Sequence, residues 1–247
     1  MRLKNKVAVI TGSSRGIGRS TALLFAEEGA KVVINYRERL GSAEDVVSSI
    51  VQKGGSAIAI QADISEPKDI KLLFRRATEA FGTVDILVNN AGICVPKPFL
   101  ELTREDMDLV FGVNVTGVVL CSQEVAKIMM PKESGKIINI ASISGIRNFG
   151  TPGNMHYAMS KASVVSATGI LAKALGPGIS VNCVVPGFVD TEMATSPEYV
   201  EQVISASALK RILRPEEIAR TCLFLASEDS DGITGEVIHV DAGFQLK

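Results

Sequence analysis

A tyrosine and a lysine four residues apart, Tyr157 and Lys161, are the residues of this chain best suited to acid–base chemistry. On a helix this spacing places the two side chains on one face, one turn apart. A lysine ammonium near a phenol favours the phenolate, so we expect the tyrosine pKa to fall below its usual value of about 10. A tyrosine with a lowered pKa can exchange protons near neutral pH. The pair therefore predicts a general acid–base centre.

A glycine-rich segment near the N-terminus, Gly12-x-x-x-Gly16-x-Gly18, follows a strand-like run and opens a helical one. Glycines allow a tight turn and the close approach of a pyrophosphate, and the helix N-terminus offers free N–H groups. Glycine turns after strands are common, so the pattern alone is weak evidence. Its position before the first helix favours dinucleotide binding. Together with the tyrosine–lysine pair, it indicates a nicotinamide-dependent oxidoreductase.

The end of the second strand-like run bears on the choice between NAD(H) and NADP(H). Enzymes that select NAD usually place an acidic residue there to hold the ribose hydroxyls, whereas a basic residue suits a 2′-phosphate. Here the run ends in Tyr36 and is followed by Arg37, and Arg15 lies within the glycine turn. Two solvated surface arginines would give the same pattern. The missing acid at Tyr36 together with Arg37 and Arg15 nevertheless favours NADP(H), with NAD(H) as the alternative.

The composition argues against several other classes of protein. The 247 residues include 26 basic and 27 acidic side chains without a basic run, which disfavours nucleic-acid or anionic-membrane binding. The four cysteines are isolated and there are only two histidines, so we expect no metal site. We find no signal-peptide pattern and no run of about twenty apolar residues that would span a bilayer. We therefore expect a cytoplasmic protein that does not bind membranes.

Short strand-like runs alternate with longer helical patterns along the chain. The strand-like runs are Val7–Thr11, Lys31–Tyr36, Ser56–Asp63, Ile86–Asn90, Lys136–Ser142, Ser180–Val185 and Glu236–Asp241. The helical patterns are Gly18–Glu28, Ser42–Lys53, Pro67–Phe81, Thr103–Met130, Tyr157–Leu175 and Pro215–Ala226. Several strand-like runs are almost continuously apolar, as expected when both faces of a sheet are covered. The alternation predicts an α/β fold of the Rossmann type, a doubly wound and mainly parallel sheet with helices on both faces, in a single domain over residues 1–247.

Further segments carry expectations about substrate access and assembly. The least regular stretch, Thr191–Lys210, could form a lid over the substrate or an ordinary surface helix. The helical segment Ala158–Leu175 is small and apolar on nearly every side, with Lys161 and Lys173 as its only charges, and Val110–Met130 is similarly apolar around its middle. A sheet buries only one face of such a helix. We therefore expect a second subunit on the other faces, in a homotetramer or at least a dimer.

Read in order, these motifs resemble the short-chain dehydrogenase/reductase family in its compact form. The matching motifs, which span essentially the whole chain, are TGSSRGIG at Thr11–Gly18, Asp63, NNAG at Asn89–Gly92, Asn114, the strand that ends in Ser142, YAMSK at Tyr157–Lys161, and Pro186-Gly187. The resemblance implies a seven-stranded sheet and a catalytic tetrad of Asn114, Ser142, Tyr157 and Lys161.

The resemblance also implies a role for each of these residues. Tyr157 would exchange a proton with the substrate oxygen while a hydride moves between the substrate carbon and nicotinamide C4. Lys161 would lower the tyrosine pKa and hold the nicotinamide ribose, and Ser142 would hydrogen-bond the reacting carbonyl. Asn114 would hold a water that links Lys161 to solvent, although it could equally satisfy backbone groups in a helix kink. The residues expected to bind the cofactor are Gly12, Ser14, Arg15, Gly16, Ile17, Gly18, Arg37, Asp63, Ile64, Asn90, Ala91, Gly92, Tyr157, Lys161, Pro186, Gly187, Val189 and Thr191.

The serine of the tetrad departs from the usual spacing. The family usually places this serine thirteen residues before the tyrosine, which here is Ser144. The strand pattern Ile137–Ser142, with Gly145 three residues later, instead matches Ser142. A two-residue insertion within Ile146–Thr151 would reconcile the two, because loops absorb insertions at little cost. We therefore expect Ser142 to be the catalytic serine.

Within the family, the chain is most similar to 3-oxoacyl-[acyl-carrier-protein] reductases, which implies interconversion of a ketone and a secondary alcohol with NADPH as donor. These enzymes meet their acidic carrier protein through basic residues beside the active site. The corresponding loops here, Pro131–Ser134 and Gly176–Gly178, carry little positive charge, which puts the acyl carrier protein in doubt as a partner. Small ketones, acyl thioesters and sugars remain as substrates. Asn35–Arg37 and His156-Tyr157 resemble sugar (glucose-type) dehydrogenases, the alternative function, and the intact tetrad opposes a non-catalytic dinucleotide-binding sensor.

Overall fold

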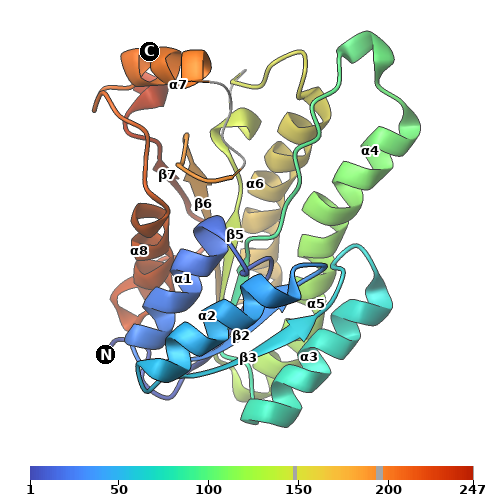
Figure 1. The fold of residues 1–247 in the computed structure, drawn as a ribbon. Helices are drawn as coiled ribbons and strands as arrows, with labels where there is room; N and C mark the ends of the chain where they lie inside the picture. Colours follow the sequence, from blue (N-terminus) through green and yellow to red (C-terminus); the bar gives the residue numbers. More distant parts are fainter. Residues whose placement is uncertain (147–148, 193–196, 247) are drawn as a thin grey trace.

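The computed structural model describes residues 1–146, 149–192 and 197–246, which contain one sheet of seven strands (Figure 1). The strands are β1 (Val7–Ile10), β2 (Lys31–Tyr36), β3 (Ser56–Gln61), β4 (Ile86–Asn89), β5 (Gly135–Ile140), β6 (Ile179–Pro186) and β7 (Val237–Val240). Their order is β3-β2-β1-β4-β5-β6-β7, and all neighbouring strands are parallel. The doubly wound Rossmann-type sheet expected from the sequence is therefore confirmed.

Helices cover both faces of this sheet. They are α1 (Gly16–Glu27), α2 (Leu40–Gln52), α3 (Pro67–Phe81), α4 (Arg104–Phe111), α5 (Gly117–Met129), α6 (Met155–Leu175), α7 (Pro197–Ala206) and α8 (Pro215–Ala226). One apolar core lies between the sheet and α1, α2 and α8, and the other lies between the sheet and α3, α5 and α6.

The side chains of strand β1 pack alternately into the two cores. Successive side chains of a strand point to opposite faces. Ala8 and Ile10 therefore pack toward α1, and Val9 packs toward α3 and α5; all three side chains are fully buried. Such strands must be apolar at every position, which explains the continuous apolar runs in the sequence.

The long helical pattern predicted over Thr103–Met130 is interrupted. A π-helical turn, Gly112–Thr116, separates α4 from α5 and contains Asn114. π-turns are uncommon and tend to occur at functional positions. By length and composition the helical stretch Arg104–Lys132 could cross a bilayer, which the sequence analysis overlooked, but half of its most apolar window is buried inside the fold. Its apolar character is that of a core helix.

The order of the strands determines where a ligand can bind. Because β1 lies between β2 and β4, the connections after β1 and β4 leave the sheet toward opposite faces. In open α/β sheets the resulting crevice at the carboxyl ends of the strands is the usual binding site. Segment 191–210, for which a lid or a surface helix was expected, contains α7; residues 193–196 of that segment lie outside the described residues.

A chain of hydrogen bonds between buried polar side chains joins the sheet to two helices. Asn89 Nδ2 on β4 donates to Asn139 Oδ1 on β5 at 2.9 Å and to Ser122 Oγ on α5 at 3.1 Å. Asn139 Nδ2 in turn donates to Thr168 Oγ1 on α6 at 3.0 Å. All four side chains are at most 2% exposed. Buried polar groups are stable only when they are hydrogen-bonded, so these bonds determine how α5 and α6 sit on the sheet.

We expect Asn139→Ala to lower the free energy of unfolding by about 1–3 kcal/mol, because it leaves buried groups of Asn89 and Thr168 short of a partner. Urea denaturation measures the change. The control is Ser49→Ala on α2, which removes a hydroxyl that hydrogen-bonds the Asp45 carbonyl oxygen at the surface, and it should change stability by less than about 0.5 kcal/mol. Equal effects of the two substitutions would contradict a structural role for these buried hydrogen bonds.

Candidate active site

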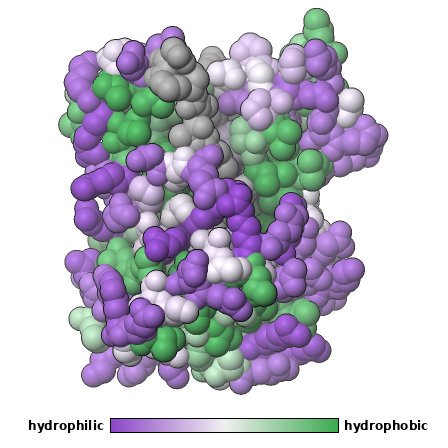
Figure 2. Space-filling view, viewed as in Figure 1, coloured by the Kyte–Doolittle hydropathy of each residue, from purple (hydrophilic) through white to green (hydrophobic). Residues whose placement is uncertain are grey.

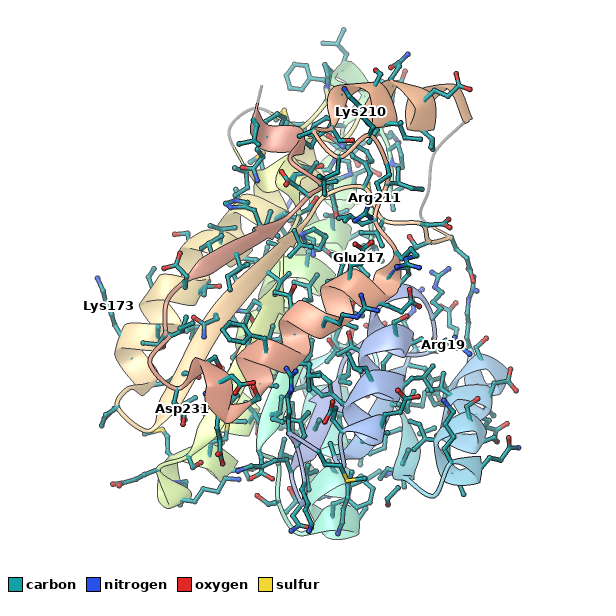
Figure 3. The ribbon with its side chains drawn as sticks, turned by 90° about the vertical axis from the view of Figure 1, so that its left-hand side faces the viewer. Arg19, Lys173, Lys210, Arg211, Glu217 and Asp231 are labelled. Atoms are coloured by element: carbon teal, nitrogen blue, oxygen red, sulfur yellow. The ribbon has the colours of Figure 1, made fainter. Side chains whose placement is uncertain are left out.

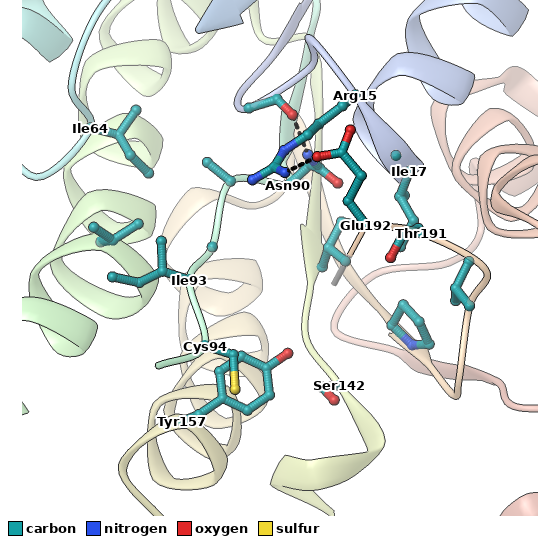
Figure 4. A pocket seen from close by; sticks show the side chains of 18 of the residues that line it. Arg15, Ile17, Ile64, Asn90, Ile93, Cys94, Ser142, Tyr157, Thr191 and Glu192 are labelled. Carbon is teal, nitrogen blue, oxygen red and sulfur yellow. Dashed lines mark hydrogen bonds and ion pairs between the residues drawn. The ribbon is translucent and has the colours of Figure 1, made fainter. Parts of the chain in front are cut away.

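A cavity of about 680 Å³ opens at the carboxyl ends of β1, β4, β5 and β6 (Figure 4). Its volume lies in the range of ligand and cofactor sites. The lining includes every site residue expected from the sequence except Gly18 and Asn114. The cavity is long: the glycine turn lies at one end, and Tyr157 and Ser142 lie at the other.

The glycine turn brings two backbone segments into contact. Gly12 has φ of +61°, and a Cβ atom there would lie 2.9 Å from the Cα of Ala91. At Gly18 a Cβ atom would lie 2.5 Å from Asn90 Nδ2 and 2.7 Å from the carbonyl oxygen of Gly12. No other residue fits at either position without displacing the backbone. Gly18 thus packs against the turn and is not among the residues that line the cavity.

Side-chain amides hold the turn in place. Asn35 Oδ1 accepts a hydrogen bond from the Gly12 N–H at 3.0 Å. Asn90 Nδ2 donates to the carbonyl oxygens of Thr11 and Gly12 at 2.9 and 3.0 Å, and Thr11 Oγ1 accepts from the N–H groups of Asn90 and Ala91. The sequence analysis missed Thr11 and Asn35 as members of the site. A buried polar residue at the end of an apolar strand was the available signal.

The turn has the properties needed to bind a pyrophosphate. It leads directly into α1, whose first N–H groups have no partner within the helix. Gly12 and Gly16, both with positive φ, line the cavity and have no side chain that would cover the backbone there. The site therefore fits a dinucleotide.

Tyr157 and Ser142 meet at the other end of the cavity. The Ser142 hydroxyl lies near enough to the Tyr157 phenol to lower its pKa, and Figure 4 shows both side chains with Cys94 beside the ring. Desolvation of the phenol raises the pKa of Tyr157 to about 12, and the nearby Ser142 hydroxyl offsets this only in part. The lowered pKa expected from the sequence is therefore wrong for this structure.

The position of Lys161 explains part of this difference. Its side chain is only 4% exposed; its Nζ donates to the carbonyl oxygen of Ile140 at 2.8 Å and lies 5.9 Å from the centroid of the Tyr157 ring. Burial disfavours the charged ammonium and lowers the pKa of Lys161 to about 8. The sequence spacing correctly placed the two residues together, but the loss of water around each group is the largest cause of its pKa shift.

Asn114 lies behind the cavity, in the π-turn. Its Oδ1 accepts from the Ile93 N–H and its Nδ2 donates to the Ile93 carbonyl oxygen, each at 2.9 Å. Nδ2 also donates to Ser160 Oγ at 2.9 Å. A Cβ atom on Gly92 would lie 3.2 Å from Lys161 Nζ and 3.3 Å from Asn114 Oδ1, so these groups converge on one backbone position. The side chain thus satisfies backbone groups, the alternative left open by the sequence, while the kink brings it close to Lys161.

Ser142 and Ser144 both line the cavity. The Ser144 N–H donates to Ser142 Oγ at 3.1 Å, and the hydroxyl that reaches Tyr157 belongs to Ser142. This geometry agrees with the choice of Ser142. Part of the loop expected to hold the insertion, residues 147–148, lies outside the described residues.

The arginines at the cofactor end are arranged differently from the expectation. Arg15 forms an ion pair with Glu192, and Arg39 Nη1 lies 2.9 Å from the same carboxylate. Arg37 instead contacts Glu38 at 2.6 Å. The sequence analysis missed Arg39 and Glu192. Arg39 belongs to the charged run that follows β2, whereas the approach of Glu192 depends on how the loop after β6 folds.

Asp63 and Ile64 line the cavity at the end of β3. The Asp63 carboxylate accepts hydrogen bonds from the N–H and hydroxyl of Ser65 at 2.9 and 2.7 Å, and it lies 3.9 Å from Arg37 Nη1. On the opposite side, the end of β6 contributes Pro186 and the segment after it contributes Gly187, Val189 and Thr191. These residues and the glycine turn enclose the cofactor end from both sides.

The end of the cavity around Tyr157 is largely apolar. Cys94, Val95, Ile143 and Phe188 line it together with Ser142 and Ser144. Burial raises the pKa of the Cys94 thiol, which therefore stays protonated and acts as a small apolar group. Cys94, Val95 and Ile143 were not predicted, because substrate-lining positions carry no motif of their own.

Comparison with known proteins agrees with this geometry. The model of a family described as enoyl-(acyl carrier protein) reductase matches residues 12–245. A 3-oxoacyl-[acyl-carrier-protein] reductase from Synechocystis sp. is 41% identical over 99% of this chain and 98% of its own length.

Solved structures show the same similarity. A short-chain dehydrogenase/reductase from Serratia marcescens has a TM-score of 0.94 and 39% identity over 99% of both chains. A short-chain dehydrogenase from Burkholderia cenocepacia, solved in complex with NADP, has a TM-score of 0.93 and 36% identity over 99% of this chain and 100% of its own. With its sheet order, its glycine turn and the residues gathered around Tyr157, the chain belongs to the short-chain dehydrogenase/reductase family of oxidoreductases.

Proposed function

We propose that this oxidoreductase is NADP(H)-dependent and interconverts the ketone of a 3-oxoacyl thioester with the corresponding secondary alcohol. The observation that carries the proposal is the meeting of Ser142, Tyr157 and Lys161 at one end of a cavity that has a glycine turn at the other. The similarity to a 3-oxoacyl-[acyl-carrier-protein] reductase supports the ketone as the reacting group.

The cofactor would be held by the residues along the cavity. The glycine turn and the N-terminus of α1 would bind the pyrophosphate, and Arg15 would bind the 2′-phosphate. Asp63 and Ile64 would lie at the adenine, Ala91 and Gly92 at the ribose, and the segment from Pro186 to Thr191 at the nicotinamide. The bound nicotinamide supplies or accepts the hydride.

The chain's own residues would supply the proton. The hydroxyls of Ser142 and Tyr157 would both donate hydrogen bonds to the ketone oxygen, which polarises the carbonyl. Because the pKa of Tyr157 is about 12, its hydroxyl is protonated at neutral pH and can give its proton to the oxygen as the alkoxide forms. Lys161, with a pKa of about 8, can return a proton to the tyrosine. This arrangement favours reduction at neutral pH.

The lining of the cavity favours an acyl substrate over a sugar. The apolar groups of Val95, Ile143 and Phe188 offer few partners for sugar hydroxyls, whose burial without hydrogen bonds is costly. His156, one of the residues that suggested a sugar dehydrogenase, is 1% exposed and is not part of the lining. Lys132, the cation of one loop that would meet a carrier protein, pairs with Asp85. We therefore place free acyl thioesters ahead of carrier-bound ones.

The absorbance of reduced cofactor tests the proposed reaction. We expect NADPH to be oxidised in the presence of short-chain 3-oxoacyl thioesters, and glucose with NADP to give no comparable rate. Parallel reactions with the acyl group on coenzyme A and on acyl carrier protein separate the two thioester carriers. Turnover of sugars alone would establish the alternative dehydrogenase, and binding of cofactor without turnover of any substrate would establish the sensor.

Tyr157→Phe should reduce turnover by about a hundredfold to ten-thousandfold, because it removes the hydroxyl that exchanges the proton. Cofactor affinity, measured by fluorescence titration, should be unchanged. In the wild-type enzyme, oxidation of the alcohol requires the phenolate, so its rate should increase with pH over the alkaline range below the tyrosine pKa of about 12. If the Tyr157→Phe enzyme kept most of its activity, the proposed mechanism would be refuted.

Ser142→Ala and Ser144→Ala form a matched pair of substitutions. We expect Ser142→Ala to lower the turnover number by about a hundredfold, as is typical when one fixed hydrogen-bond donor to a developing oxyanion is lost. Ser144→Ala, which removes a neighbouring hydroxyl from the same cavity, should have a much smaller effect. Steady-state kinetics that showed the opposite order would make Ser144 the catalytic serine.

The surface of α6 supports the proposed homotetramer. Met159 and Ile170 on this helix are 42% and 65% exposed, and Lys173 points away from the body of the molecule (Figure 3). Hydrophobic side chains also gather at the tip of the loop before α4, which carries Phe99 and Leu100 (Figure 2). Apolar residues exposed on one helix are typical of a surface that another subunit covers.

Sedimentation velocity at micromolar concentration should show an assembly of four copies of the 26.2 kDa chain. Ile170→Glu should shift the distribution toward smaller species, because it places a charge in the contact. Val51→Glu, at a 53% exposed position on α2, is the control and should leave the assembly unchanged. A wild-type protein that sediments as a monomer would contradict the proposal.

A further inference from the structure

Three phenylalanines from distant segments form a cluster beside the apolar end of the cavity. Phe149 lies in the loop after β5, Phe188 follows β6, and Phe244 begins a short helical turn at the C-terminus. The centroid of the Phe244 ring lies 5.3 Å from that of Phe188 and 5.5 Å from that of Phe149, and the ring planes are inclined by 65° and 59°. Aromatic pairs attract each other in such tilted and edge-to-face arrangements. Phe244 therefore joins the C-terminal turn to the loops that follow β5 and β6.

Of this cluster, only Phe188 is among the described residues that line the cavity. The side chains of Phe188 and Phe244 both pack against a third group of buried apolar residues, which includes Ile143 and Val185. Ile143 also lines the cavity. Phe244 thus lies one layer behind the lining, where it supports the ring that faces a substrate without facing the substrate itself.

The backbone around Phe188 is held in place by neighbouring strands and loops. The Phe188 carbonyl oxygen accepts a hydrogen bond from the Leu213 N–H at 2.8 Å. One residue earlier, the Gly187 N–H donates to the carbonyl oxygen of Val240 on β7, also at 2.8 Å. The Phe188 ring can therefore move chiefly by rotation about its own side-chain bonds. The Phe244 ring occupies part of the space into which it would turn.

The C-terminal turn holds Phe244 in position. The Phe244 N–H donates to the Asp241 carbonyl oxygen at 3.1 Å, and the Asp241 carboxylate accepts from the N–H groups of Gly243 and Gln245 at 2.9 and 3.0 Å. A Cβ atom on Gly243 would lie 2.6 Å from that of Ala208, which follows α7, and Figure 1 shows the C-terminus beside this helix. The turn is therefore anchored at several points, and its phenylalanine gives the Phe188 ring a fixed support.

We propose that Phe244 is a positioning residue that determines substrate specificity: by supporting the Phe188 ring, it limits the length of the acyl chain that the cavity accepts. The inference rests on the proposed reduction of 3-oxoacyl thioesters and deepens it by naming the residue that sets chain length. Protein interiors are closely packed, so a smaller side chain at position 244 leaves space into which the Phe188 ring can turn. The apolar end of the cavity then becomes deeper and can bury further methylene groups of an acyl chain.

Steady-state kinetics with the coenzyme A thioesters of 3-oxobutanoate and 3-oxooctanoate test the inference. In Phe244→Ala, the ratio of kcat/KM for the longer substrate to that for the shorter should rise about tenfold, the equivalent of about two more buried methylene groups. The change should come from a lower KM for the longer substrate, while kcat for the shorter one stays within about twofold of wild type. Leu246→Ala, at an 83% exposed position of the same turn, is the control and should leave the ratio unchanged.

A double variant tests whether Phe244 acts through Phe188. Phe188→Ala should raise the same ratio, and the addition of Phe244→Ala should then change it no further, because the supported ring is already absent. Thermal unfolding of each variant verifies that the fold is retained. If Phe244→Ala does not fold, Phe244→Leu, which keeps much of the apolar bulk, takes its place and should shift the ratio in the same direction by a smaller factor.

A crystal structure provides a readout that needs no turnover. In the variant at position 244, the Phe188 ring should turn toward the vacated space and the cavity should be larger than in the wild-type protein. An unmoved ring would overturn the inference. So would an equal loss of kcat/KM for both chain lengths, which would make Phe244 a purely structural residue, and so would additive effects in the double variant. A wild-type enzyme that reduces no acyl thioester would refute the proposed function instead, and the position of the Phe188 ring would still decide the inference.

Discussion

The contact between the backbones that follow β1 and β4 is the constraint on which the rest of the site depends. A side chain at Gly12 would collide with Ala91, and one at Gly92 would press against Lys161 and Asn114. These contacts bring the glycine turn after β1 and the segment after β4 close to Lys161 and Asn114. The two backbone segments can approach this closely because Gly12 and Gly92 lack a Cβ atom.

The fold and the residues around Tyr157 could be predicted largely from the sequence, because each depends on local patterns. Apolar runs such as that of β2 reveal strands buried on both faces, and the four-residue spacing of Tyr157 and Lys161 places both on one face of a helix. The sequence left a helix kink at Asn114 open but did not identify the π-turn, because the helical pattern continues from Thr103 to Met130 without a break. Nothing in the local sequence marks where one extra residue enters a helical turn.

The errors in electrostatics have a different cause. A pKa depends on how much water surrounds a group, and burial is a property of the whole fold. The sequence placed Lys161 beside Tyr157 correctly, yet desolvation raises the pKa of the tyrosine and lowers that of the lysine. Likewise, the sequence marked Arg15 and Arg37 as cations near the cofactor but could not show which carboxylates neutralise them. The pairing of Arg15 with Glu192 joins residues 177 positions apart.

The hydrogen bonds through Asn89, Asn139 and Thr168 make the position of α6 on the sheet independent of the residues that line the cavity. Apolar contacts between a helix and a sheet tolerate sliding, whereas a hydrogen bond between an amide and a hydroxyl is made in only one register. Thr168 lies about 16 Å along α6 from Tyr157, at a rise of about 1.5 Å per residue, and so the axial position of the tyrosine is determined far from the cavity. Residues such as Val95 and Ile143 can consequently vary in size and shape without displacing the Tyr157 hydroxyl. Such an arrangement allows one catalytic apparatus to be adapted to many substrates, by natural divergence or by protein engineering.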